Sequence, residues 1–277
     1  MIANPTVRPA SHRAIGVFDS GVGGLTVLKA LRRRLPKEST IYLGDTARVP
    51  YGTKSAEAVR RYSLSNANWL FQNDIKLLVV ACNTASAVAL PQLQERLPIP
   101  VIGVIEPGAK AAAKASKSGQ IGVIGTPSTI ESGAYQRAIG QLRPGSTVIA
   151  RSCPLFVPLA EEGWTTGEVP LAVARHYLSS LAQSSLDTLV LGCTHYPLLR
   201  AVIAEALQNR LLLVDSAEAT AEEVAALLRS RELLGGEAPV KHRYWVTDTP
   251  RLFTRVGSNF LGETIVSAEQ VDVLLEG

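Results

Sequence analysis

Short apolar runs rich in β-branched residues alternate with longer amphipathic segments along most of the chain. Such runs indicate strands buried on both faces, and the amphipathic segments between them indicate helices that cover a parallel sheet. In the first part of the chain we predict strands at residues 15–19, 40–45, 77–81 and 100–105. We predict helices at residues 25–35, 55–71 and 106–117, and after Cys82 a short helix that restarts at Pro91, because proline suits only a first turn.

The same order of elements then begins again. Ile-Gly-Val at residue 15 returns at residue 121, Val-Pro at residue 49 returns at residue 157, and Cys82 has a counterpart in Cys193, which gives offsets of 106, 108 and 111. Near-constant offsets indicate an internal duplication of an α/β unit. The predicted fold is therefore α/β, with two pseudo-symmetric three-layer domains whose mainly parallel sheets face each other across a central cleft. The tail after Asp215 has no counterpart and is expected to cover the first unit.

Two of the three cysteines lie at equivalent points of two strand-to-helix turns. Cys82 follows the apolar run 77–81, and Cys193 follows the run 188–192. A thiol at the carboxyl end of a parallel strand lies where open α/β sheets bind ligands, and a following helix N-terminus favours the thiolate. A buried cysteine can also be a small apolar core residue, the role expected of Cys153, which has no counterpart. The duplication favours a chemical role for the other two.

Two thiols on opposite sides of one bound carbon suit a racemase or an epimerase. One thiolate removes a proton while the other thiol delivers a proton to the opposite face, and a thiol pKa of about 8.5 allows both roles. A metal site is disfavoured because neither Cys-x-x-Cys nor His-x₃-His spacing accompanies the cysteines. A cysteine hydrolase would leave one of the two thiols unexplained.

Composition narrows the class of protein. The chain has 277 residues, 46% of them hydrophobic, and a formal charge of +4, so we expect a globular protein and consider nucleic-acid binding unlikely on charge grounds. Three cysteines cannot all pair, which favours a reducing compartment and disfavours a disulfide between Cys82 and Cys193. The first residues have no apolar signal-peptide core, and no run is long enough to span a membrane. We therefore expect a cytoplasmic protein that does not bind membranes.

A glycine-rich turn, Ser20-Gly-Val-Gly-Gly24, follows the first strand. Its spacing matches neither a dinucleotide fingerprint nor a phosphate loop, because the third glycine comes too early and no Lys-Ser/Thr follows. We therefore expect a carboxylate- or amine-sized ligand at Asp19 and Ser20.

The motifs together resemble the cofactor-independent aspartate/glutamate racemase superfamily. The resemblance extends from about residue 15 to the C-terminus. It rests on Asp-Ser-Gly-Val-Gly-Gly, Pro-Tyr-Gly, Ala-Cys-Asn-Thr-Ala, Val-Pro-Leu-Ala-Glu and Gly-Cys-Thr-His, which begin at residues 19, 50, 81, 157 and 192. The first two of these motifs are typical of the glutamate branch.

The resemblance implies interconversion of L- and D-glutamate, which supplies D-glutamate for peptidoglycan, with neither metal nor other cofactor. It implies that Cys82 acts on the proton of the D-enantiomer and Cys193 on that of the L-enantiomer, assisted by Asp19, His195 and Glu161. Whether Glu161 or Glu162 faces the cleft stays open, as does the role of Asp45. The substrate-binding positions implied are Asp19, Ser20, Tyr51, Gly52, Asn83, Thr84, Thr194 and His195.

Relatives also have a discontinuous first domain and often form homodimers. We accordingly expect a flexible leader at residues 1–14, a first domain at residues 15–98 and 208–277, and a second at residues 99–207. The alternatives left open are an aspartate or hydantoin racemase, a one-cysteine decarboxylase, which the second thiol disfavours, and a binding protein without catalysis or with a partner such as DNA gyrase.

Overall fold

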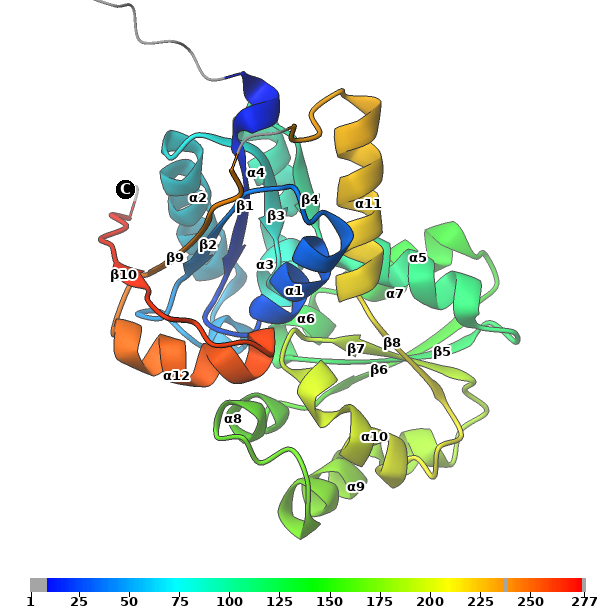
Figure 1. Cartoon of the computed structure of the whole chain (residues 1–277). Coiled ribbons are helices and arrows are strands. Elements are labelled where there is room, and N and C mark those ends of the chain that lie inside the picture. The colour runs from blue at the N-terminus through cyan, green and yellow to red at the C-terminus, as the bar shows by residue number, and fades with distance from the viewer. Residues whose placement is uncertain (1–8, 237–238, 276–277) are drawn as a thin grey trace, which may run out of the picture.

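The computed structural model describes residues 9–236 and 239–275, which form two parallel sheets, each with helices on both faces (Figure 1). The first sheet has the strand order β10-β9-β2-β1-β3-β4, and the second has the order β6-β5-β7-β8. The strands of the first sheet are β1 (Ala14–Asp19), β2 (Thr40–Gly44), β3 (Ile75–Val80), β4 (Val101–Gly103), β9 (His242–Val246) and β10 (Glu269–Gln270). Those of the second are β5 (Gln120–Gly125), β6 (Thr147–Ser152), β7 (Thr188–Gly192) and β8 (Leu212–Asp215).

The topology confirms the predicted duplication. The order β2-β1-β3-β4 in the first sheet is matched by β6-β5-β7-β8 in the second, and every strand pair is parallel. In the tail, β9 pairs with β2 and so extends the first sheet at this edge. In the second sheet, no described strand pairs with the corresponding edge of β6. The predicted α/β class and the pair of facing sheets are therefore confirmed.

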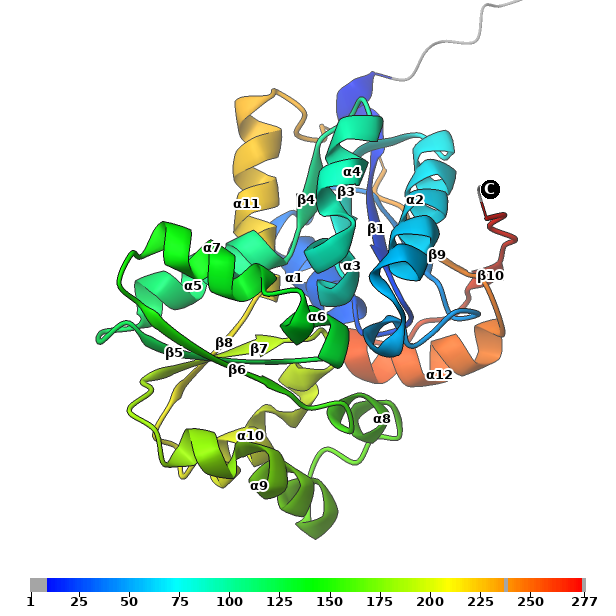
Figure 2. The same cartoon turned by 180° about the vertical axis from the view of Figure 1, so that it is seen from behind.

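Helices cover both faces of the first sheet. Two of them, α1 (Leu25–Arg34) and α11 (Ala217–Ser230), pack against each other on the near face in Figure 1. Figure 2 shows the other face, which carries α2 (Ala56–Gln72), α3 (Asn83–Val88) and α4 (Leu90–Arg96). The break between α3 and α4 is the predicted one, and Pro91 lies in the first turn of α4. The last helix, α12 (Pro250–Leu261), packs against α1.

The second sheet is covered in the same way. On one side lie α5 (Ile105–Ala115), α6 (Pro127–Glu131) and α7 (Ala134–Leu142), and on the other lie α8 (Phe156–Glu161), α9 (Glu168–Ala182) and α10 (Arg200–Ala206) (Figures 1 and 2). Short 3₁₀ helices occur at η1 (Ala10–His12), η2 (Tyr51–Thr53) and η3 (Tyr196–Leu199). Among the described residues, none of the helices combines the length and the hydropathy needed to cross a membrane.

The predicted domain boundaries are wrong by one strand on each side. β4 pairs with β3 in the first sheet, although residues 99–207 were assigned to the second domain, and β8 pairs with β7 in the second sheet, although residues 208–277 were assigned to the first. The chain therefore crosses after β4 and returns after β8. The partner of an edge strand is a non-local property, so the sequence pattern of these strands did not reveal it.

Part of the predicted flexible leader, residues 1–14, has regular secondary structure. Residues 1–8 lie outside the described residues, but Ala10–His12 form η1 and Ala14 already begins β1. The backbone carbonyl of Ser11 accepts a hydrogen bond from Lys76 Nζ at 2.8 Å, which fastens this segment to β3.

Candidate active site

The two cysteine-bearing turns lie at the carboxyl edges of the two sheets, where they meet. Cys82 follows β3 and caps the N-terminus of α3, with its sulfur accepting from the Ala85 N–H at 3.5 Å. Cys193 follows β7, but here a 3₁₀ helix, η3, comes before α10. The α-helix expected directly after Cys193 is therefore displaced, with Pro197 near the start of η3.

Both cysteines line one small cavity of about 20 Å³. This volume holds roughly one water molecule, so the cavity must widen to admit a substrate with several heavy atoms. We call this narrow arrangement the closed form. The cavity is lined by residues from both domains: Ser20, Val49, Pro50, Tyr51, Gly52, Cys82, Asn83, Thr84, Thr126, Val157, Cys193, Thr194 and His195. All predicted substrate-binding residues except Asp19 are in this group.

On one side of the cavity, Cys193 lies beside His195, and His195 is in turn hydrogen-bonded to Glu161. His195 Nδ1 lies 3.8 Å from Cys193 Sγ, and His195 Nε2 lies 2.9 Å from Glu161 Oε1. Burial opposes the charged form, but the hydrogen bonds and negative charges of Cys193 and Glu161 outweigh it and raise the pKa of His195 to about 10. At neutral pH this side therefore holds an imidazolium beside the sulfur. The carboxylate that reaches His195 is that of Glu161, and the Glu162 side chain is exposed.

On the other side, no cation of the described residues lies beside Cys82. Its S–H donates to Ser20 Oγ at 3.8 Å, and burial, followed by the charge of Asp19, raises the pKa of Cys82 to about 12. The helix N-terminus expected to favour a thiolate at this position is thus outweighed by burial, because desolvation penalises the charged form. In the closed form Cys82 is a protonated thiol.

Asp19 lies behind the cavity wall and is fully buried. Its Oδ2 accepts from the Gly21 N–H at 2.9 Å, and Thr194 Oγ1 donates to its Oδ1 at 3.5 Å. Burial raises the pKa of Asp19, while the positive charge of His195 acts in the opposite direction. The carboxyl group therefore lies between the two half-sites and contacts residues of both.

Small residues allow the domains to meet closely here. A Cβ atom on Gly23 would lie 2.3 Å from Thr194 Oγ1, and one on Gly52 would lie 2.5 Å from Thr126 Cβ. Across the same interface, Thr84 Oγ1 lies 2.9 Å from Thr126 Oγ1 and 3.1 Å from Thr129 Oγ1.

Sequence reasoning missed Thr126, Thr129 and Gly23 as contributors to the closed interface. One signal could have identified Thr126, because it lies 106 positions after Ser20 and so occupies the duplicated place of a predicted ligand residue. Val49, Pro50 and Val157 also line the cavity and were not singled out as site residues.

Asp45 supports the cavity wall without lining it. It is fully buried and hydrogen-bonded to the hydroxyl of Tyr51, to Asn66 Nδ2 at 3.2 Å and to Thr247 Oγ1 at 2.9 Å. Arg48 Nη1 adds an ion pair at 2.8 Å. Asp45 therefore holds Tyr51 in place.

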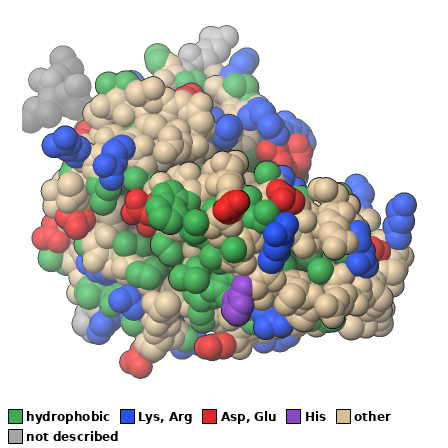
Figure 3. All heavy atoms as spheres, turned by 90° about the horizontal axis from the view of Figure 1, so that it is seen from below, with side chains coloured by type: hydrophobic (Ala, Val, Ile, Leu, Met, Phe, Trp, Pro, Cys, Tyr) green, Lys and Arg blue, Asp and Glu red, His purple; other side chains and the backbone are tan. Residues whose placement is uncertain are grey.

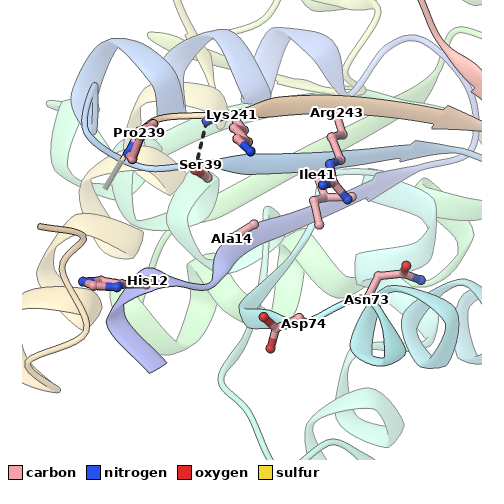
Figure 4. Close-up of a pocket in the computed structure, with 9 residues that line it drawn as sticks. All are labelled: His12, Ala14, Ser39, Ile41, Asn73, Asp74, Pro239, Lys241 and Arg243. Carbon is pink, nitrogen blue, oxygen red and sulfur yellow. Dashed lines mark hydrogen bonds between the residues drawn. The ribbon is translucent and has the colours of Figure 1, made fainter. Parts of the chain in front are cut away.

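A larger hollow of about 350 Å³ lies at the amino ends of β1, β2 and β9, away from the cysteines (Figure 4). Its lining includes His12, Asp74, Lys241 and Arg243, but no thiol. It therefore lacks the paired acid/base groups of the cavity at the domain interface. Within the described ranges, no group of three or more His, Cys, Asp or Glu side chains is arranged to hold a metal ion.

Comparison with known proteins agrees with this geometry. The sequence profile of the Asp/Glu/Hydantoin racemase family matches residues 15–224. The chain belongs to this family. The resemblance predicted from the motifs is thereby confirmed.

Within the family, the chain is similar to glutamate racemases. It is 59% identical over 265 residues to the glutamate racemase of Geobacter metallireducens, covering 95% of this chain and 98% of that protein. The crystal structure of the isoform RacE1 from Bacillus anthracis superposes with a TM-score of 0.90 at 41% identity, covering 96% of this chain and 100% of that one. The Francisella tularensis glutamate racemase, solved in complex with D-glutamate, gives a TM-score of 0.90 at 39% identity, covering 95% and 98%.

Proposed function

We propose that this racemase interconverts L- and D-glutamate without a cofactor, using Cys82 and Cys193 as the two acid/base groups. The observation that carries the proposal is that both cysteines line one small cavity closed between two duplicated half-sites. The glutamate specificity is supported by the similarity to glutamate racemases over nearly the whole chain.

The two thiols have different surroundings in the closed form. Cys193 lies beside the His195 imidazolium, whereas Cys82 lies beside Ser20 and its pKa is raised by burial. We propose that one direction of the reaction starts with Cys193 as the base and Cys82 as the acid. A substrate whose α-hydrogen faces Cys193 would lose that proton to the Cys193 thiolate and receive a proton from Cys82 on the opposite face. By family resemblance this substrate is L-glutamate. The reverse reaction needs the opposite state, with Cys82 as thiolate and Cys193 as thiol.

The weakly acidic α-proton makes water exclusion and fixed donors necessary. A carbanion with no cofactor to delocalise it must be stabilised by hydrogen-bond donors that are already oriented when the proton leaves. Ser20, Asn83, Thr84 and Thr194 supply polar groups around the cavity, whose volume of about 20 Å³ leaves room for roughly one water molecule. We therefore propose that the domains open to admit glutamate and close on it.

Activity on L-glutamate, L-aspartate and a hydantoin tests the proposal, with optical rotation and α-deuterium incorporation followed in D₂O. We expect racemisation and exchange with both enantiomers of glutamate and much slower turnover of the other substrates. Binding of glutamate without α-exchange would instead indicate a binding protein, and faster turnover of aspartate or hydantoin would indicate another branch of the family. Small-angle scattering with and without D-glutamate tests the closure, since identical profiles contradict it.

We further propose that the protein acts in the cytoplasm, supplying D-glutamate for peptidoglycan, and that it forms a homodimer. Figure 3 shows hydrophobic side chains gathered on the face that carries α12 and α8, and the exposed apolar residues include Leu155, Trp164 and Leu252. Contiguous exposed apolar surface is typical of association sites. Light scattering after size exclusion tests the dimer, and a monomeric mass at micromolar concentration contradicts it.

A further inference from the structure

Asn83 presents a buried N–H₂ group that no described protein atom satisfies. Its side chain lines the cavity, and the residue is 3% exposed. Asn83 Oδ1 accepts a hydrogen bond from the Tyr135 hydroxyl at 2.7 Å, while Asn83 Nδ2 has no hydrogen-bond partner among the described residues. Buried polar groups are nearly always paired, so an open amide donor in a cavity suits an incoming acceptor such as a carboxylate oxygen.

Tyr135 touches both cysteine-bearing turns. Its hydroxyl binds Asn83, the residue after Cys82. Its ring packs against Gly192, the residue before Cys193, where a Cβ atom would lie only 3.0 Å from Tyr135 Cε2. Tyr135 belongs to α7 of the second domain, whereas Asn83 begins α3 of the first. The hydrogen bond between them therefore joins the two domains.

We propose that Tyr135 is a positioning residue of the active site, which fixes the side-chain amide of Asn83 so that its Nδ2 faces a carboxylate oxygen of the substrate. This inference rests on the proposed function. The oxygen and nitrogen of an amide have nearly the same shape, so packing alone does not choose between the two orientations. In the flipped orientation Oδ1 would face the carboxylate, and two acceptors would repel each other.

The surroundings of Tyr135 keep its hydroxyl a donor to Asn83. Burial raises the pKa of Tyr135 above its ordinary value, so the hydroxyl retains its proton. Tyr135 therefore directs one donor of the first domain at the substrate from a position in the second.

A double-mutant cycle on the full chain tests this role. We expect Tyr135→Phe to raise the KM for both glutamate enantiomers by about tenfold, with a smaller change in kcat, because the free amide can then turn its oxygen to the carboxylate. In the Asn83→Ala background, Tyr135→Phe should have no further effect on KM. The matched control is Tyr177→Phe, which removes the hydroxyl that accepts from the Leu155 N–H at 3.3 Å elsewhere in the second domain. It should leave KM unchanged.

Additive effects of the two substitutions, or an equal effect of the control, would assign Tyr135 a merely structural role and overturn the inference. A second measurement uses the wild-type protein and does not depend on whether Tyr135→Phe folds. In protein labelled with ¹⁵N-asparagine, the Asn83 side-chain amide, assigned with Asn83→Ala, should shift on addition of D-glutamate, and an unchanged signal contradicts the inference. Failure of wild-type racemisation would contradict the proposed function, whereas normal racemisation with an additive cycle contradicts only the role of Tyr135.

Discussion

Cys82 and Cys193 occupy the same position in two copies of one structural unit, and both line a single cavity between the copies. Each follows a strand that pairs with the first strand of its own repeat, β3 beside β1 and β7 beside β5. Their surroundings differ, since Cys193 lies beside His195 and Cys82 beside Ser20. The backbone is therefore duplicated, but the electrostatic environment of the two thiols is not.

Replacing either cavity cysteine should strongly slow racemisation. We expect Cys82→Ser and Cys193→Ser each to lower kcat by about a hundredfold to ten-thousandfold, because a serine hydroxyl is a far weaker acid than a thiol. Cys153→Ser is the matched control. Cys153 is buried but does not line the cavity, so this variant should lose stability and retain kcat/KM. Circular dichroism with each enantiomer as substrate measures all three variants, and normal turnover by either of the first two would refute the two-thiol assignment.

Substitutions of the two adjacent glutamates, Glu161 and Glu162, should differ sharply in their effect on kcat and on the pKa of His195. Glu161→Gln removes the carboxylate bonded to His195 Nε2, so the pKa of His195 should fall and kcat should drop on the order of a hundredfold. Glu162→Gln makes the same change of charge on an exposed side chain and should leave both unchanged. Titration of the His195 ring by NMR, together with racemisation rates, distinguishes the two variants. Equal losses of kcat in the two variants would show that Glu161 acts through its charge alone and not through its hydrogen bond to His195.

Stability should decrease at alkaline pH because of His195. Its pKa is raised from 6.5 to about 10 in the folded state, so folding binds a proton between these values. The contribution to the free energy of unfolding is fully present below about pH 6.5 and is lost as the pH rises through about 10. Cys82, raised from 9.0 to about 12, adds a further decline above pH 9.

Urea unfolding between pH 6 and 9 measures this decline. His195→Gln should flatten it, while His176→Gln, which alters an exposed histidine on α9, should not. A wild-type curve that rises across this interval would contradict the assigned direction of the His195 shift.

A buried ion pair far from the cavity, Lys76–Glu38, should contribute to the free energy of unfolding but not to catalysis. Lys76 Nζ lies 2.5 Å from Glu38 Oε2 and also donates to the backbone carbonyl of Leu233 at 2.7 Å, while the Gly235 N–H donates to Glu38 Oε1. Lys76→Met leaves Glu38 buried without its cation, so we expect a loss of about 3–5 kcal/mol in the free energy of unfolding.

The control for this prediction is an exposed pair, Arg33–Glu218, whose side chains are 71% and 58% exposed. Arg33→Met should cost less than about 1 kcal/mol, because solvent screens exposed charges. Chemical denaturation measures both, and equal losses would argue against a special role for the buried pair.

The sequence by itself determined most of the strands, the duplication and the cavity thiols. Apolar runs and helical periodicity are local signals, and the repeated motifs placed Cys82 and Cys193 at equivalent turns. The same motifs indicated most of the residues that line the cavity, including Asn83 and His195.

Only the tertiary structure decided which sheet β4 and β8 join, which of the two glutamates reaches His195, and that Tyr135 and Thr126 meet the first domain. It also decided that Cys82 is a thiol, because burial outweighs the helix N-terminus. Strand partners, desolvation and contacts between domains depend on residues far apart in the chain, and no local pattern records them.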